Sequence, residues 1–114
     1  MHELGIIVHI AKSLKQIAAE NDLTNIGSVT LEIGEVSTVV PSYLTDCWQY
    51  YRKKEALFAD AELKIEMLEA ITYCENCEKQ YPTVQYGRQC PHCGSYETYL
   101  LVGEECNIKE IEAY

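Results

Sequence analysis

Two Cys-x-x-Cys pairs constrain this chain more than any other feature. The pairs are Cys74/Cys77 and Cys90/Cys93, and twelve residues separate them. Each pair can direct two sulfurs toward one point, and four thiolates complete a tetrahedral site with metal–sulfur bonds of about 2.3 Å in the case of zinc. Such a site has no open coordination position. The spacing therefore predicts a structural zinc site, with the functional chemistry elsewhere in the chain.

Iron is the alternative metal for the same four ligands. A rubredoxin-like electron-transfer site uses a similar Cys-Pro-x-Cys-Gly turn, which stands here at residues 90–94. Gly94 allows the backbone to turn back, so that amides can approach the sulfurs. A thioredoxin-like redox pair is disfavoured, because neither Cys-x-x-Cys opens a helix after a strand. The pattern favours zinc and leaves iron open.

Charge and cysteine usage exclude several classes of protein. The 114 residues include 9 basic and 18 acidic side chains, for a net charge of −9. Nucleic-acid binding needs clustered Lys and Arg, and the only dense run is 52–54. Six cysteines without a signal peptide favour a reducing compartment, and the apolar stretch 5–8 is too short to span a membrane. We expect a cytoplasmic protein whose partner is a cation or a basic protein surface.

Apolar periodicity predicts two helices. The first covers residues 4–20, where apolar side chains recur at steps of three and four. The second starts near Pro41 and Ser42, since proline suits a first turn and serine is a good N-cap, and it ends near Leu57. The expected buried stripes are Ile7, Ile10, Leu14 and Ile17 in the first helix and Leu44, Cys47, Trp48 and Tyr51 in the second.

Alternating apolar residues predict the strands. Val29, Leu31 and Ile33 alternate with polar residues, and residues 63–67 repeat the pattern. The tail, 106–114, alternates less cleanly and is interpreted as a third strand. Two helices and two or three strands are enough for one helix layer on one face of a small sheet.

The segment 71–103 differs in composition from the rest of the chain. It contains the four paired cysteines among Tyr, Gly and Pro, and its 33 residues fall below the roughly 40 that usually fold alone without a metal or disulfide. Metal binding must therefore supply its folding free energy. We interpret 71–103 as a zinc module inserted into a larger domain made of residues 1–70 and 104–114.

The first tripeptide, Met1-His2-Glu3, is the other unusual feature. The terminal amine, the amide nitrogen of His2 and its imidazole can close two fused chelate rings on one metal ion, and such nitrogen donors suit Ni(II) or Cu(II). Glu3 can add a carboxylate or its own amide nitrogen. On this chemistry alone, a disordered terminal histidine is the favoured interpretation. No nucleophile or acid–base pair is recognisable, so we do not expect an enzyme.

Taken together, these motifs resemble the HypA/HybF family of nickel metallochaperones. The resemblance rests on the N-terminal tripeptide, the stretch 29–35, the strand 61–66 and the two cysteine pairs, in order over essentially the whole length. It reverses the interpretation of the terminus, since His2 matches the family's nickel ligand, Met1 supplies the amine and Glu3 matches the adjacent acidic residue. The paired cysteines match the zinc ligands: Cys74, Cys77, Cys90 and Cys93.

The resemblance implies a fold, a function and partners. The fold is a three-stranded mixed sheet with two helices, plus a zinc-ribbon-like module. The function is delivery of Ni(II) as cargo during maturation of nickel–iron hydrogenase, or of urease. The partners are a nickel-handling GTPase, the hydrogenase large subunit or a urease accessory protein, and a homodimer stays open. The end of the second helix, 50–54, departs from the family pattern. Rival interpretations are a zinc-ribbon interaction adaptor without metal transport and a rubredoxin-like electron carrier.

Overall fold

The computed structural model describes residues 3–114, and the chain forms two compact units. We call them the helical unit and the cysteine unit. The helical unit runs to Leu31 and also contains Val39–Glu66 and Asn107–Tyr114. The cysteine unit contains Glu32–Thr38 and Met67–Cys106.

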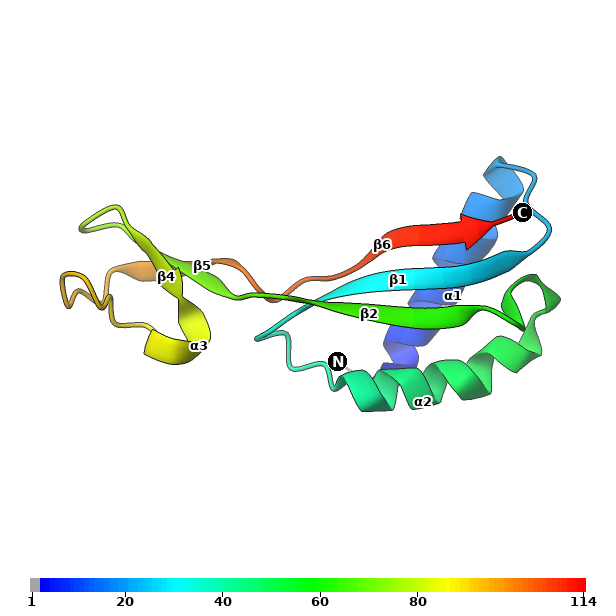
Figure 1. Cartoon of the computed structure of the whole chain (residues 1–114), viewed down its shortest axis with the longest axis horizontal. Coiled ribbons are helices and arrows are strands. Elements are labelled where there is room, and N and C mark those ends of the chain that lie inside the picture. Colours follow the sequence, from blue (N-terminus) through cyan, green and yellow to red (C-terminus); the bar gives the residue numbers. More distant parts are fainter. Residues whose placement is uncertain (1–2) are drawn as a thin grey trace. The chain divides into compact units, whose positions relative to one another are not determined.

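Both predicted helices form in the helical unit. Helix α1 covers Glu3–Glu20 and helix α2 covers Pro41–Tyr51 (Figure 1). Proline occupies the first turn of α2 as expected, but Ser42 lies inside the helix and Val40 is the cap residue. The predicted end near Leu57 is wrong, because the α-helix stops at Tyr51.

Two short 3-10 turns, η1 (Arg52–Lys54) and η2 (Ala56–Phe58), follow α2. The tighter turns place the Phe58 ring against Trp48, with 5.4 Å between the two ring centroids. Phe58 is fully buried. The indole Nε1 of Trp48 donates to the backbone oxygen of Ala61 at 2.9 Å. Apolar residues therefore continue to face the core beyond Tyr51, although the backbone there is no longer α-helical. Periodicity alone extended the predicted helix too far for this reason.

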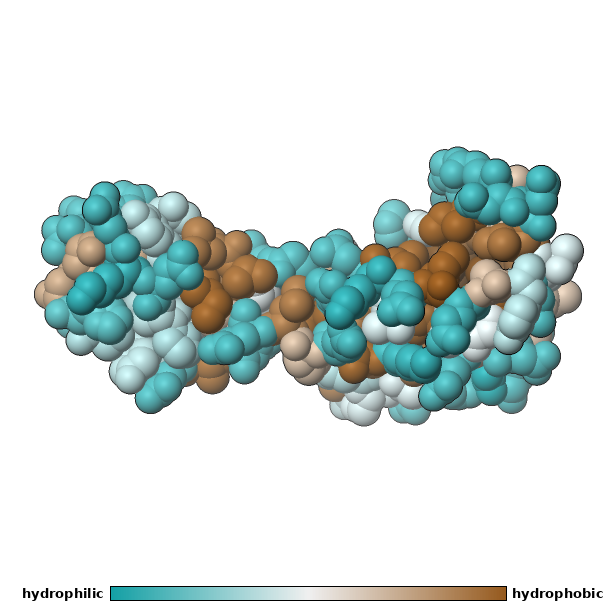
Figure 2. Space-filling view, turned by 45° about the horizontal axis from the view of Figure 1, so that its top comes forward, coloured by the Kyte–Doolittle hydropathy of each residue, from teal (hydrophilic) through white to brown (hydrophobic). Residues whose placement is uncertain are grey.

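The core of the helical unit contains most of the predicted stripe residues. Ile7, Leu14, Leu44 and Trp48 are fully buried, whereas Cys47, Tyr51 and Ile17 are only half-buried. Apolar residues also reach the surface of this unit, which is the right-hand one in Figure 2.

Three strands form the first sheet, in the order β2-β1-β6. They are β1 (Ile26–Gly34), β2 (Glu62–Leu68) and β6 (Cys106–Ala113). Asn25, before β1, exchanges backbone hydrogen bonds with Tyr114, after β6, so these two strands are antiparallel. Glu35, after β1, donates to Leu68 at the end of β2, so those two strands run in the same direction. The sheet is mixed, and the tail is the predicted strand, paired with β1.

A second sheet, in the order β4-β3-β5, forms within the cysteine unit. Both neighbours run antiparallel to β3, with Tyr73 opposite Gln80 on one side and Tyr99 on the other. The sequence did not reveal these short elements: β3 (Ile71–Cys74), β4 (Gln80–Pro82), helix α3 (Thr83–Tyr86) and β5 (Thr98–Val102).

Candidate metal centre

Two turns of matching geometry hold the four paired cysteines. In the first turn the Glu78 amide donates to the Cys74 carbonyl at 2.9 Å, and in the second the Gly94 amide donates to the Cys90 carbonyl at 2.8 Å. In both turns the amide of the first cysteine also donates to a carbonyl five positions on, at 2.9 Å. The turn-closing residues have positive φ, 60° at Glu78 and 76° at Gly94. Gly94 thus makes the turn expected of it, and Glu78 adopts the same turn at a steric cost.

The turns bring the four sulfurs together. All four Sγ atoms lie within 4.8 Å of one another. The distance is 3.6 Å between Cys74 and Cys93 and also 3.6 Å between Cys77 and Cys90, so each short pair joins one sulfur from each turn. A tetrahedron with metal–sulfur bonds of about 2.3 Å has edges of about 3.8 Å, whereas a disulfide needs about 2.05 Å. The spacing therefore fits four ligands around one metal ion.

The four thiols differ in burial and in pKa. Cys74 and Cys90 are buried and Cys93 is exposed. Burial raises the pKa of the Cys77 thiol to about 12, while the side-chain amide of Asn76, followed by a backbone hydrogen bond, lowers the pKa of Cys93 to about 6. Four thiolates at these separations repel one another, so the cluster needs a cation to ionise fully. Thiolate ligands select zinc or iron rather than magnesium or calcium.

Three of the four cysteines also form the centre of a small buried core within their unit. Cys74, Cys90 and Tyr81 are the buried residues of this core, with Cys77 packed against them. The Tyr81 hydroxyl donates to the Gly87 carbonyl at 2.9 Å. Among the described residues around the sulfurs, the only aromatic ring in this cluster is that of Tyr81, so the structure of the two turns depends on the sulfurs.

The residues predicted to bind nickel lie at the start of the chain. Met1 and His2 are outside the described residues. Glu3 is the first residue of α1, and its Oε2 accepts a hydrogen bond of 3.4 Å from the backbone amide of Val40. His9 is exposed on α1. Within residues 3–114, the cysteine cluster is the only group of three or more His, Cys, Asp or Glu side chains close enough to share a metal.

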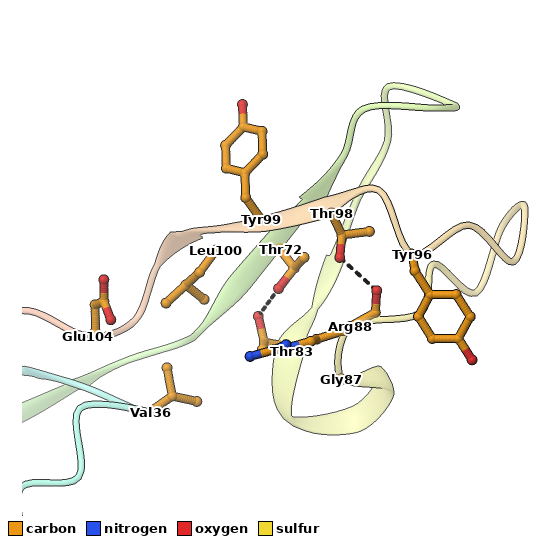
Figure 3. A pocket seen from close by; sticks show the side chains of 10 residues that line it. All are labelled: Val36, Thr72, Thr83, Gly87, Arg88, Tyr96, Thr98, Tyr99, Leu100 and Glu104. Atoms are coloured by element: carbon orange, nitrogen blue, oxygen red, sulfur yellow. Dashed lines mark hydrogen bonds between the residues drawn. The ribbon is translucent and has the colours of Figure 1, made fainter.

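The cysteine unit also contains a pocket of about 480 Å³ (Figure 3). The Arg88 side chain extends toward Thr83, and Val36 and Leu100 point into the same space. The Thr83 hydroxyl already forms a hydrogen bond with the Thr72 hydroxyl, and the two oxygens are 2.6 Å apart. No histidine or cysteine is among the described residues that line the pocket.

Comparison with known proteins identifies the class. A family model described as "Hydrogenase/urease nickel incorporation, metallochaperone, hypA" matches residues 1–113. The class is therefore that of metallochaperones and maturation factors. This chain belongs to the HypA family.

Relatives and solved structures agree with this assignment. Proteins named hydrogenase maturation factor HypA from Geobacter metallireducens and Geotalea uraniireducens are each 33% identical over 112 residues, which is 98% of both chains. The solution structure of the Ni metallochaperone HypA from Helicobacter pylori matches with a TM-score of 0.76 at 23% identity, covering 99% of this chain and 97% of that one. That likeness confirms the fold. No helix among residues 3–114 is long and apolar enough to cross a membrane.

Proposed function

We propose that this chain binds Ni(II) at its N-terminus and delivers it during maturation of nickel–iron hydrogenase. The observation that carries the proposal is the family match, which extends over residues 1–113 and so includes the terminal tripeptide as well as both cysteine pairs. Delivery of nickel to urease is the related function that the family description also names.

The proposed nickel ligands are the Met1 amine, the imidazole and backbone nitrogen of His2, and Glu3. Glu3 stands at the beginning of α1, where backbone amides have no acceptor within the helix. Its amide nitrogen is therefore open to a metal, while its carboxylate lies near the start of α2 through Val40. Copper should bind at least as tightly as nickel, because affinity follows the divalent series. Selectivity then comes from partners and metal supply.

Zinc is proposed for the four-cysteine cluster. The geometry that supports it is the 3.6 Å spacing of sulfurs across the two turns, Cys74 to Cys93 and Cys77 to Cys90. We assign residues 71–103 to an inserted zinc domain, and residues 1–70 with 104–114 to the nickel domain. The zinc would be structural, because its four protein ligands leave no open position.

The proposed partners are a nickel-handling GTPase, the hydrogenase large subunit and, for urease, an accessory protein. The support is the name of the relatives, hydrogenase maturation factor HypA, carried by chains that match over nearly their whole length. A maturation factor must transfer its cargo to another protein, which an open terminal site permits.

The sharpest test moves only the terminal amine. A Gly-Ser extension ahead of Met1 keeps every side chain, and we expect it to abolish nickel binding measured by calorimetry and X-ray absorption. His2→Ala should do the same, whereas His9→Ala, at an exposed histidine of α1, is the matched control and should bind normally. Zinc content and far-UV circular dichroism should be unchanged in all three.

Two results would redirect the assignment. Unchanged nickel affinity in both the extended protein and His2→Ala would rule out the terminal ligands as the nickel site. Absence of nickel binding by the unmodified protein would leave an adaptor with no transported metal. Iron in the protein as isolated, with reversible one-electron reduction, would instead indicate an electron carrier.

A further inference from the structure

The outer face of α2 carries two tyrosines that are not part of the core. Tyr43 is 60% exposed and Tyr50 is 63% exposed. They are seven positions apart, or two turns, so they share one face of the helix. The opposite face holds Leu44 and Trp48, both fully buried. Helix α2 is therefore anchored without the tyrosines, and their exposure needs another explanation.

Cations follow the tyrosines directly. Arg52, Lys53 and Lys54 are three of the nine basic residues of the chain. The Lys54 ammonium lies 4.8 Å from the centroid of the Tyr50 ring and 5.6 Å from that of Tyr51, so it is held beside the aromatic face.

These cations are not all available to a partner. Arg52 is half-buried and donates through its Nη1 to the Ala61 carbonyl at 3.1 Å, so it serves the fold. Lys53 and Lys54 are exposed, and within residues 3–114 neither lies in an ion pair. The nearby carboxylate of Glu55 pairs with Lys15 instead. Two lysines thus present unneutralised charge next to exposed aromatic rings.

The sign of this charge is opposite to that of the chain. A net charge of −9 repels acidic proteins in general, so an uncompensated basic cluster is a local exception. Tyrosine is among the residues that carry most of the binding energy in protein interfaces, and exposed lysines add electrostatic steering and specificity around it. Asp46 is exposed between the two tyrosines and would repel an acid there. Attraction for acids is therefore confined to the C-terminal end of the helix.

We propose that this surface, made by Tyr43, Tyr50, Lys53 and Lys54, docks an acidic segment of a partner protein. The acids of that segment face the two lysines, and its apolar side chains lie against the two tyrosine rings. Nucleic acid and anionic lipid are poorer occupants, because two lysines cannot offset the repulsion between a polyanion and a chain of this net charge. The inference does not depend on nickel binding.

A peptide titration tests the chemistry of the surface. The probe is a synthetic peptide in which Asp and Glu alternate with Leu and Phe, added to the full-length zinc-loaded protein and followed by ¹⁵N NMR. Shifts should map to the outer face of α2. Lys53→Ala and Lys54→Ala should each weaken binding about two- to fivefold, as expected for exposed ion pairs. Tyr50→Ser should weaken it about fivefold or more.

Matched controls separate this surface from general charge and stickiness. Lys12→Ala, at an exposed lysine of α1, and Tyr96→Ser, at a tyrosine that is 71% exposed in the cysteine unit, should leave the affinity unchanged. A peptide with Lys in place of the acids should not bind. Absence of binding, shifts centred elsewhere, or equal losses in the controls would overturn the proposal. So would tighter binding of duplex DNA or phosphatidylglycerol vesicles at the same residues, or dimerisation through this face.

Discussion

Replacing one cluster cysteine should unfold the cysteine unit and leave the helical unit folded. In Cys74→Ser a hydroxyl takes the place of a sulfur that lies 3.6 Å from Cys93 at the centre of the core. Serine is a poor ligand for zinc, so the site loses one of four thiolates and with it the closed tetrahedral shell.

The size of the effect follows from what else holds this unit together. Structural zinc contributes about 10–16 kcal/mol of apparent binding free energy in small zinc domains at neutral pH. The buried core beside the sulfurs offers a single aromatic ring, Tyr81, and burial of such a side chain contributes about 1.5–3 kcal/mol. Loss of the metal therefore removes several times more than the ring provides. The helical unit should be little affected, because Leu44, Trp48 and the α1 stripe are buried without any sulfur ligand.

Amide hydrogen exchange followed along the chain measures this outcome. The amides of Glu78 and Gly94, which close the two turns, should lose protection in Cys74→Ser, while those flanking Trp48 keep it. Cys106→Ser makes the same chemical change at a half-buried cysteine outside the cluster. In this control variant the amides of Glu78 and Gly94 should stay protected. Retained protection of both turn amides in metal-free Cys74→Ser would refute the reasoning.

The other predictions concern nickel affinity, the strained backbone at Glu78, and two local contacts, one made by Trp48 and one by Gly34. Nickel binding, titrated by calorimetry, should weaken as pH falls through the reference pKa values of the α-amino group, about 7.7–8.0, and of histidine, about 6.5, because protons compete for both ligands. Glu78→Gly should raise the stability of the zinc form by about 0.5–1 kcal/mol in thermal unfolding, since glycine accepts φ of 60° without strain; a loss would contradict it. Trp48→Phe should lower the free energy of unfolding in urea by about 1–2 kcal/mol, because the hydrogen bond from the indole to the Ala61 carbonyl is lost. An unchanged unfolding midpoint would count against that contact. Gly34→Ala should cost about 1–3 kcal/mol, because the new methyl group would overlap the Gly103 carbonyl; a fully stable variant would show that the backbone yields there.

Sequence patterns located the helices and strands in which buried apolar residues recur at a regular spacing. Ile7 and Leu14 recur with the helical period because each faces the same core, and Val29 and Leu31 are fully buried in the strand where the alternation placed them. The end of α2 was missed because Phe58 is buried through a tighter turn, and apolar spacing does not distinguish the two kinds of turn.

The cysteine unit was predictable in its ligands and not in its elements. Cys-x-x-Cys spacing dictates where the sulfurs meet, whatever the flanking strands do, whereas β4 and α3 are three and four residues long and carry no period. Glu78 gave no local signal either, since a non-glycine residue at positive φ is rare. At the terminus, chemistry alone favoured a disordered histidine over a metal ligand. Only the resemblance over the whole chain supplied the nickel assignment.

The two proposed metals make opposite demands on the fold. A structural ion must not leave, and here each close sulfur pair joins the two turns, with Cys74 and Cys90 buried beneath. Release of that ion would require the core of its unit to open, so its exchange is limited by unfolding. A delivered ion must leave readily, and ligands at the start of α1 can be exchanged one at a time while Ile6, Ile7 and Ile10 hold the helix in the core. Placing the cargo site at the chain terminus therefore separates release of the metal from stability of the domain that carries it.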